Sequence, residues 1–561
     1  MQAIYNIPEI CARHQIRHAV ISPGSRSAPL TIAFARHKDI ECAVAGDERS
    51  AAFIALGMAI QTGNTVVLIC TSGSAALNYY PAIAEAFYQK IPLLILTADR
   101  PPEWIGQMDG QTIRQNEVYG HHAKASYTFP DNYSLPDSRW HSERLVSEAI
   151  IASQTYPAGP VHINIPLREP FYPENTITYS QDVKIIRTWR PKTSLYNETI
   201  EELRQTLEKT SAILIIAGQL TEALSPDSRD ALRNFAETFG AVLLAEPLSN
   251  CQDVTPSVNH YELILSNVPE TERDQLRPEL IITFGDAIVS KSLKQFIRAS
   301  RPEHWHIQPS GNTADLFQCL TRVIPVNVSD FFSLLNIQSP SIKAYRKHWL
   351  QLEEKYAKLH RRFFENQQTL AELTAINAAI EALPERSVLH LSNSMPIRYI
   401  GYTGLALKDV RTFCNRGVSG IDGVISTAVG AASVTSSPVT IITGDMAFFY
   451  DRNALWNTLN PSNLRVIVLN NHGGGIFRMI EGPAKQPELE KYFVTEQPLS
   501  AVGYAYEHNL DYYFCKDLDT LRKQLISFYQ PSESAKILEI ETNPIVDKEI
   551  LKEYKNTAYH D

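Results

Sequence analysis

Short apolar runs alternate with helix-length amphipathic stretches three times along the chain, and this alternation limits the possible folds more than any other feature. Short runs rich in Ile, Val and Leu that end at Gly, Asp, Asn or Ser are typical of buried parallel strands. Strands separated by helical segments predict right-handed βαβ units. We therefore expect an α/β fold with three doubly wound parallel sheets, whose strands include 18–22, 42–45, 66–70, 93–97 and 161–165, then 212–217, 241–245, 280–284 and 305–308, and finally 387–391, 439–443, 466–469 and 537–540.

The length of the chain, 561 residues, is too great for a single hydrophobic core. A proline-bearing stretch from Pro170 to about Pro191 is typical of a linker, and a charged helical segment at 338–367 precedes the third set of strands. We predict domains at 1–175, 190–335 and 365–561.

The composition excludes several classes of partner. The net charge of −9 argues against a nucleic-acid or anionic-membrane partner. No apolar stretch approaches the roughly 20 residues of a membrane-spanning helix, and the N-terminus has no secretory pattern. Seven cysteines without a CxxC pair indicate reduced thiols, so we expect a cytoplasmic protein without membrane insertion.

Two polar pairs follow neighbouring apolar runs in the third set of strands. Gly444-Asp445 ends the run at 439–443, and Asn470-Asn471 ends the run at 466–469, with a crossover helix expected at 454–459. Ligands bind at this edge of open α/β sheets. A carboxylate and an amide oxygen, followed by Gly473 and two further glycines, suit a divalent cation such as Mg²⁺ that holds a diphosphate. Asp, Asn and Gly also favour ordinary turns, which is the alternative interpretation.

Several arginines also follow predicted strands. Arg26, Arg100, Arg398 and Arg416 are the clearest cases. Each one alone is more often part of a surface ion pair, but several at one edge favour recognition of carboxylates, because the planar guanidinium group binds them through two hydrogen bonds. An acidic protein needs such local clusters to bind an anionic substrate.

The order and spacing of the Gly-Asp and Asn-Asn pairs resemble the diphosphate-binding signature of thiamin diphosphate enzymes. Three α/β domains resemble the decarboxylase branch, in which the first domain binds the aminopyrimidine and the third binds the diphosphate. Over essentially the whole chain the sequence resembles the 2-succinyl-5-enolpyruvyl-6-hydroxy-3-cyclohexene-1-carboxylate synthase family. The segments that carry this resemblance are SPGSRSAPL, DERSAAFIALG, CTSGSAALNYYPA, LTADRPPE, QTIRQ, NRGVSGIDGVISTA and NNHGGGIF.

The resemblance implies thiamin diphosphate as the cofactor, with Mg²⁺ or Mn²⁺, and an enzyme of menaquinone biosynthesis. It implies decarboxylation of 2-oxoglutarate and addition of the succinyl carbanion equivalent to isochorismate. It also implies a homodimer or homotetramer, in which Glu48 of one subunit and Asp445 of another serve the same site.

The resemblance assigns roles to individual residues. Glu48 would bind the aminopyrimidine and activate the cofactor, although a carboxylate that opens a helix also complements the helix dipole. Gln111 would lie near the new carbon–carbon bond. The implied substrate contacts are Ser25, Arg26, Arg100, Lys291, Ser394, Arg398 and Arg416; the implied cofactor contacts are Glu48, Ile421, Gly444, Asp445, Met446, Ala447, Asn471, Gly474, Ile476 and Phe477; and the implied metal ligands are Asp445, Asn471 and Gly473. Ordinary core packing is the alternative for Ile421, Ile476 and Phe477.

The chain departs from the family pattern at three positions. Gly110 precedes Gln111 where Asn is common, and Ser292 follows Lys291 where a second cation is expected. His472 stands where the third Asn of a run is expected, and we expect its side chain to point away from the metal. Two other hypotheses remain open, a different 2-oxo acid decarboxylase or carboligase, and a non-catalytic anion-binding protein on the same fold.

Overall fold

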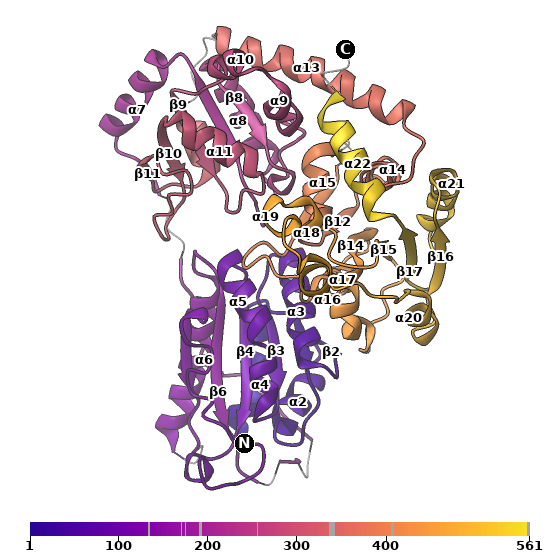
Figure 1. Cartoon of the computed structure of the whole chain (residues 1–561). Coiled ribbons are helices and arrows are strands. Elements are labelled where there is room, and N and C mark those ends of the chain that lie inside the picture. The colour runs from indigo at the N-terminus through magenta and orange to yellow at the C-terminus, as the bar shows by residue number, and fades with distance from the viewer. Residues whose placement is uncertain are drawn as a thin grey trace.

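The computed structural model describes residues 1–132, 135–169, 171–173, 176–189, 193–254, 256–335, 343–405 and 409–557. In this part of the chain the strands form three parallel sheets flanked by helices, which confirms the predicted α/β class (Figure 1). None of the described helices is both long and apolar enough to cross a bilayer. The predicted linker residues Pro170, Arg190 and Pro191, and positions 338–342 of the predicted helical segment, lie outside the described residues.

The first sheet, as far as it is described, has the strand order β2-β1-β3-β4-β6-β5. Buried strands such as β3 have no solvent-facing side, which explains their continuous apolar sequence. The strand order reverses between β1 and β3, so the segments that follow these two strands form the edge where a ligand can bind. The elements are β1 (His18–Ile21), β2 (Glu41–Val44), β3 (Val66–Cys70), β4 (Leu93–Asp99), β5 (Ala125–Thr128) and β6 (Pro160–Pro166), with α1 (Gln2–Arg13), α2 (Ala28–Ala35), α3 (Glu48–Thr62), α4 (Ser74–Asn78), α5 (Tyr80–Gln89), η1 (Pro102–Trp104), η2 (Gly120–His122) and α6 (Pro136–Gln154).

The described central sheet has the order β11-β10-β9-β7-β8, with its reversal between β7 and β9. The elements are β7 (Ile213–Ala217), β8 (Val242–Ala245), β9 (Leu280–Phe284), β10 (Glu303–Ile307) and β11 (Leu320–Ile324), with α7 (Asn197–Lys209), α8 (Pro226–Thr238), η3 (Pro247–Ser249), α9 (Tyr261–Asn267), α10 (Glu270–Gln275), α11 (Lys291–Ser300) and α12 (Val328–Leu334).

The third sheet repeats the strand order of the first, because its described strands run β13-β12-β14-β15-β17-β16. Its reversal lies between β12 and β14. The strands are β12 (Val388–Leu391), β13 (Arg411–Cys414), β14 (Val439–Gly444), β15 (Leu464–Asn470), β16 (Asp511–Cys515) and β17 (Lys536–Glu541). The helices are α13 (Ala344–Asn366), α14 (Glu372–Ala382), α15 (Met395–Thr403), α16 (Val424–Ser433), α17 (Asp445–Tyr450), η4 (Arg452–Leu455), α18 (Ile476–Met479), α19 (Glu481–Ala484), the π-helical turn η5 (Leu489–Val494), α20 (Val502–Glu507), α21 (Leu518–Phe528) and α22 (Pro544–Lys555).

The predicted crossover helix at 454–459 is wrong. The chain between β14 and β15 instead forms α17 directly after the strand, then the short η4. The side chain of Asn457 closes a turn by donating to the carbonyl of Ala454 (2.6 Å) and accepting from the N–H of Leu459 (2.7 Å). Pro461 follows, so a continuing helix is blocked.

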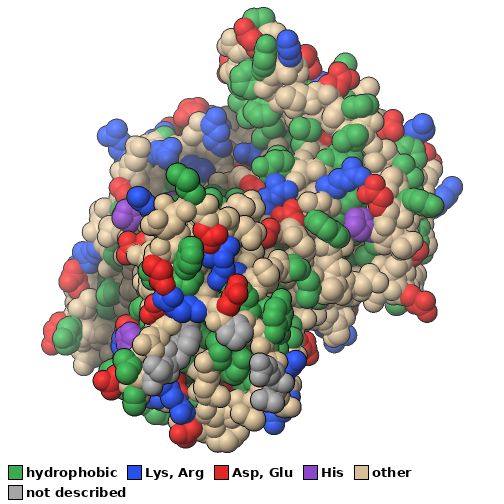
Figure 2. Space-filling model, turned by 90° about the horizontal axis from the view of Figure 1, so that it is seen from below, with side chains coloured by type: hydrophobic (Ala, Val, Ile, Leu, Met, Phe, Trp, Pro, Cys, Tyr) green, Lys and Arg blue, Asp and Glu red, His purple; other side chains and the backbone are tan. Residues whose placement is uncertain are grey.

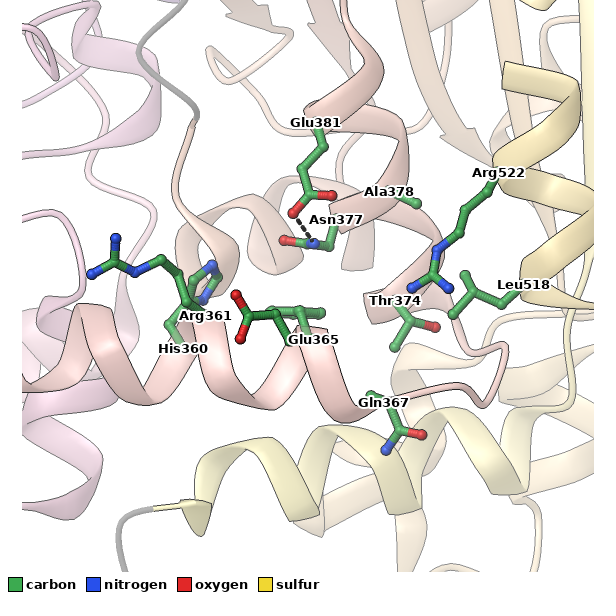
Figure 3. A pocket seen from close by; sticks show the side chains of 11 residues that line it. His360, Arg361, Glu365, Gln367, Thr374, Asn377, Ala378, Glu381, Leu518 and Arg522 are labelled. Atoms are coloured by element: carbon green, nitrogen blue, oxygen red, sulfur yellow. Dashed lines mark hydrogen bonds between the residues drawn. The ribbon is translucent and has the colours of Figure 1, made fainter. Parts of the chain in front are cut away.

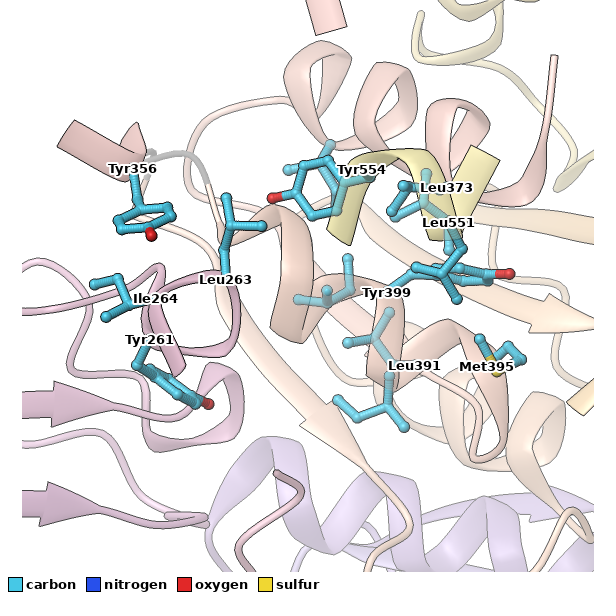
Figure 4. Packing of buried hydrophobic residues seen from close by; sticks show 14 of the residues in the cluster. Tyr261, Leu263, Ile264, Tyr356, Leu373, Leu391, Met395, Tyr399, Leu551 and Tyr554 are labelled. Atoms are coloured by element: carbon cyan, nitrogen blue, oxygen red, sulfur yellow. The ribbon is translucent and has the colours of Figure 1, made fainter. Parts of the chain in front are cut away.

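The three domains share hydrophobic cores. One core joins the first and third domains and includes Phe53 of α3 and Val424 of α16. Another joins the central and third domains, where Tyr261 and Ile264 of α9 and Tyr399 of α15 belong to the same group of packed side chains (Figure 4). Because these cores cross the domain boundaries, the loop edges of the three sheets are held in fixed relation to one another.

Candidate active site

Asp445 and Asn471 lie at the carboxyl ends of the neighbouring strands β14 and β15, which pair in parallel with Gly444 opposite Leu469. Both side chains are buried, with exposed fractions of 2% and 6%. The Asp445 carboxylate accepts hydrogen bonds from the Met446 N–H and from Gln497 Nε2, each at 2.7 Å. Burial raises the pKa of Asp445, and these hydrogen bonds oppose that shift. The carboxylate is therefore desolvated, so a cation beside it would favour its ionised form.

The amide of Asn471 is oriented by a buried glutamate. Nδ2 of Asn471 donates to Glu372 Oε1 at 2.8 Å, whereas its Oδ1 atom is buried and has no hydrogen-bond partner in the described part of the chain. Burial and the neighbouring Asp547 raise the pKa of Glu372. A buried acceptor without a partner beside a buried carboxylate fits a divalent cation with oxygen ligands. The described residues contain no cluster of three or more His, Cys, Asp or Glu side chains suited to a metal, so the remaining ligands would be a carbonyl, diphosphate or water.

The glycine turn after β15 is tightly folded against these residues. The Gly475 N–H donates to the Gly473 carbonyl (2.9 Å), and the Gly474 N–H donates to the Val494 carbonyl (2.7 Å). A Cβ atom at Gly475 would overlap the Asn471 amide, so only glycine permits this approach. His472 has its Nδ1 atom 3.2 Å from the Gln497 carbonyl.

The other predicted cofactor contacts lie around the same strand ends. Gly444 is the last residue of β14, Met446 and Ala447 follow it in α17, and Gly474 lies in the turn after β15. Ile421 is half-buried against the core that joins the first and third domains, and Ile476 against the core that joins the central and third domains, whereas the Phe477 ring packs 5.7 Å from that of Phe493.

Glu48 is the first residue of α3 and is half-buried. The preceding Asp47 caps the helix by accepting a hydrogen bond from the Arg49 N–H (2.9 Å), and its second oxygen accepts from Asn453 Nδ2 of the third domain (2.8 Å). The Glu48 charge also contributes to raising the pKa of Cys70, a shift caused mainly by burial. Its carboxylate therefore lies near the end of β3, in the edge formed at the reversal of the first sheet.

Gln111 lies in a loop that Arg100 holds in place. Arg100 donates through Nη2 to the Gly110 carbonyl (2.9 Å) and its Nε lies 3.1 Å from Asp109 Oδ2. Gln111 itself has a φ of +54° and an exposed side chain. A Cβ atom at Gly73 would lie 3.3 Å from the backbone of Gln111, so this glycine permits the close approach of the two loops.

Ser25 and Arg26 face different environments. Ser25 is exposed, whereas Arg26 is buried to 6% exposure, donates to the Leu167 carbonyl (2.9 Å) and stacks over Phe171. If Arg26 binds substrate as predicted, its guanidinium group must do so in addition to making these two contacts.

Arg398 and Arg416 come together from α15 and from the loop after β13. Arg398 donates to the carbonyl of Ser394, and Arg416 Nη1 donates to Asn393 Oδ1 at 3.0 Å. Desolvation and then the Arg416 charge lower the pKa of Arg398. The predicted Lys291 lies exposed at the first position of α11 in the central domain.

A pocket of about 360 Å³ lies elsewhere, between α13, α14 and α21. Its lining includes Arg361, Glu365 and Arg522, and no predicted site residue (Figure 3). Seen from below, the molecule has mixed charges on its nearest part, with Lys and Arg side chains around a hollow at the upper left of the view (Figure 2).

Known proteins resemble this chain along its whole length. A protein of Cytophaga hutchinsonii named 2-succinyl-5-enolpyruvyl-6-hydroxy-3-cyclohexene-1-carboxylate synthase is 48% identical over 99% of both chains. The chain belongs to the 2-succinyl-5-enolpyruvyl-6-hydroxy-3-cyclohexene-1-carboxylate synthase family. Synthases of the same name from Flavobacterium johnsoniae and Phocaeicola vulgatus are 37% and 36% identical, each over 98% of this chain and 97% of the relative.

Two domain families also match this synthase-family chain. The family described as thiamine pyrophosphate enzyme, N-terminal TPP binding domain, matches residues 4–122. The family described as middle domain of thiamine pyrophosphate matches residues 183–391. The chain is therefore a thiamin diphosphate-dependent enzyme, and thiamin diphosphate is its cofactor.

Three side chains that shape this synthase-family candidate site are not predicted from the sequence. Gln497 and Glu372 hold Asp445 and Asn471, and Glu85 of the first domain accepts the backbone N–H of Gly417 beside Arg416. None of them lies in a motif next to its partner, so their roles are set by the folding of distant segments.

Proposed function

We propose that the chain decarboxylates 2-oxoglutarate and joins the remaining four-carbon unit to isochorismate, giving 2-succinyl-5-enolpyruvyl-6-hydroxy-3-cyclohexene-1-carboxylate for menaquinone biosynthesis. The observation that carries this proposal is the 48% identity over 99% of both chains to a synthase named for that product. The loss of CO₂ drives the reaction, and the new carbon–carbon bond retains the remaining carbons of both substrates.

Thiamin diphosphate would supply the electron sink for decarboxylation and the nucleophilic carbon for the new bond. Asp445, Asn471 and the Gly473 carbonyl would hold its diphosphate through Mg²⁺ or Mn²⁺, a role supported by the buried, unpartnered Oδ1 atom of Asn471. Gly444, Met446, Ala447 and Gly474 would surround the diphosphate, with Ile421, Ile476 and Phe477 as the apolar wall.

Glu48 would hold a proton at the aminopyrimidine ring nitrogen and so assist removal of the thiazolium proton. Its half-buried position at the start of α3 supports this role. Gln111 would donate a hydrogen bond near the reacting carbons, and its left-handed backbone conformation is of the kind that clusters at functional sites.

Both substrates are anionic and would be held by local cations on an acidic protein. The groups assigned to this task are Ser25, Arg26, Arg100, Lys291, Ser394, Arg398 and Arg416. The pairing of Arg398 with Arg416 across two segments supports such an anion site, since like charges held close together favour binding of an anion between them.

The assembly proposed is a homodimer, or a homotetramer built from it, in which Glu48 of one subunit and Asp445 of another act in one site. The domain limits proposed are 1–175, 190–335 and 365–561, each of which contains one sheet. A cytoplasmic location is supported by the seven cysteines, all of which are free thiols.

A product-resolved assay tests the function. The purified chain, loaded with thiamin diphosphate and Mg²⁺, is given 2-oxoglutarate and isochorismate, and the products are resolved by chromatography and mass spectrometry. The expected result is the adduct together with one CO₂ per turnover. Formation of acetolactate from pyruvate alone, without the expected adduct, would assign the chain to another carboligase activity.

A further inference from the structure

One face of α11 carries a row of cations. Lys291, Lys294 and Arg298 are spaced three and four residues apart, so they lie on the same side of the helix. The buried residues Leu293 and Ile297 pack on the other side. Of this row, only Lys291 corresponds to a residue of the family pattern.

The start of α11 is firmly anchored at the carboxyl edge of the central sheet. The buried carboxylate of Glu246 accepts hydrogen bonds from the backbone N–H groups of Val289 (3.0 Å) and Ser290 (3.2 Å). Helical side chains lean towards the N-terminus of their helix. Lys294 does so, because its Nζ atom donates to the Ile288 carbonyl at 3.2 Å. One of the three ammonium donors is thereby used, and two remain for a ligand.

The third domain meets this same edge next to Arg416. Gln219 donates through Nε2 to the Cys414 carbonyl (3.2 Å), and Asn250 bonds both backbone groups of Thr412 (2.7 and 3.2 Å). These contacts fix the end of β13, two residues before Arg416, against the loops of the central sheet.

Three cations therefore converge, and no carboxylate of a described residue is bound to them. Among the described residues, Lys294 and Arg398 each donate to a backbone carbonyl, and Arg416 donates to a side-chain amide oxygen. The Nε atom of Arg416 is buried and has no partner within the described ranges. Burial lowers the pKa of Lys294, and the charges of Arg416, Arg298 and Arg398 lower it further, against an opposing effect of Glu246.

Ser292 departs from the family pattern, and the nearby Lys294 offers a positive charge at the same end of α11. Ser292 donates its hydroxyl hydrogen to Glu262 and contributes no charge. Lys294, half a turn further along α11, directs its ammonium group back to the start of the helix.

We propose that Lys294 is a further substrate-binding residue of this chain, which holds a carboxylate of one of the two anionic substrates together with Arg398 and Arg416. It supplies the positive charge that Ser292 lacks. This inference rests on the proposed function for the identity of the substrates, and on the cation cluster for the site.

The test compares Lys294→Met, which keeps the length of the side chain and removes its charge, with Lys294→Arg and with Lys209→Met on α7 as the matched control. Charge-assisted hydrogen bonds correspond to about a tenfold or greater change in affinity. In the holoenzyme, Lys294→Met is expected to raise the KM for 2-oxoglutarate or isochorismate about tenfold or more with kcat little changed. Lys294→Arg is expected to restore most of the affinity, and Lys209→Met to leave both KM values unchanged.

KM values within about twofold of the wild type for both substrates in Lys294→Met would overturn the inference, as would a fall in kcat alone. If Lys294→Met does not fold, as judged by its melting temperature, Lys294→Gln replaces it. Calorimetric titration of succinate, a dicarboxylate without a reacting carbonyl, separates this inference from the proposed function. Weaker succinate binding in Lys294→Met than in Lys209→Met supports the anion site even if the wild type forms no adduct, and equal binding refutes it.

Discussion

At the scale of the residue, the surroundings of Asn471 favour a ligand. Its Nδ2 atom donates to Glu372, which leaves Oδ1 buried, at the edge where β14 and β15 end, with no partner among the residues that the structure describes. An unsatisfied buried acceptor costs about 1–3 kcal/mol, which a bound cation would offset. The neighbouring Asp445 is desolvated, so a cation would benefit both side chains.

Asn471→Ala is expected to weaken binding of Mg²⁺ with thiamin diphosphate on the order of 10–100-fold, because it removes a proposed oxygen ligand. Calorimetric titration of the metal-loaded cofactor into the apoprotein measures the change. Asn64→Ala, at an exposed position after α3, is the matched control and should bind normally. Unchanged cofactor affinity in Asn471→Ala would remove Asn471 from the metal site.

Glu48→Gln is expected to bind the cofactor normally but to lose about 10²–10⁴ in kcat, because the amide cannot hold the proton at the aminopyrimidine nitrogen. Steady-state kinetics and cofactor titration measure the two quantities. The control is Glu41→Gln, at an exposed position on β2. If Glu48 only complements the dipole of α3, the variant would lose a little stability and keep its turnover.

At the scale of the elements, α3 and α16 cross with their backbones in close contact. A Cβ atom at Gly57 would overlap the carbonyl of Thr427, and one at Gly430 would overlap the carbonyl of Ile54. Since α3 begins at Glu48, this crossing sets the position of the carboxylate relative to the third domain.

Gly430→Ala is expected to lower the melting temperature of the chain, because overpacking against the backbone of α3 costs about 1–3 kcal/mol or more. Gly503→Ala, in α20 with open space around its Cβ position, is the control and should be neutral or slightly stabilising. Differential scanning fluorimetry compares the two variants. Equal melting temperatures would show that the crossing relaxes without cost.

The strands that could be predicted are those whose own sequence, a continuous apolar run, indicates that they are buried. The strand at Leu280–Phe284 is predicted to the residue because every position is buried. The four strands that were not predicted, β5, β11, β13 and β16, are all sheet edges, where partial exposure permits polar residues and removes the apolar run. Asp445 and Asn471 could be predicted because each directly follows its strand. Gln497, Glu372 and Lys294 could not, since their positions depend on distant segments.

At the scale of the whole molecule, shared cores join both outer domains to their neighbours, so one chain presents the loop edges of its three sheets in a fixed arrangement. Within the chain, both neighbours of Glu48 contact the third domain: Asp47 contacts η4, and Arg49 contacts the last residue of α17. Asp445 lies at the opposite end of α17. The proposed site across two subunits can therefore be tested by mixing variants.

Glu48→Gln and Asn471→Ala chains, mixed after reversible dissociation, are expected to regain about a quarter of wild-type activity. In a C₂ dimer half of the molecules would be mixed, and each would contain one site with both native residues. Light scattering should give twice the chain mass of 63.0 kDa, or four times that mass for a tetramer. No recovery in a demonstrated mixed dimer, or a fully active monomer, would place both residues in one chain.

The two glycine contacts between α3 and α16 are symmetric. Gly57 meets the residue three positions before Gly430, and Gly430 meets the residue three positions before Gly57. The two helices also occupy equivalent places in sheets of the same strand order, each between the second and third strands of its domain. The first and third domains thus pack against each other like the two subunits of an isologous dimer, related by a local pseudo-twofold axis. Here both halves of the pair belong to one polypeptide.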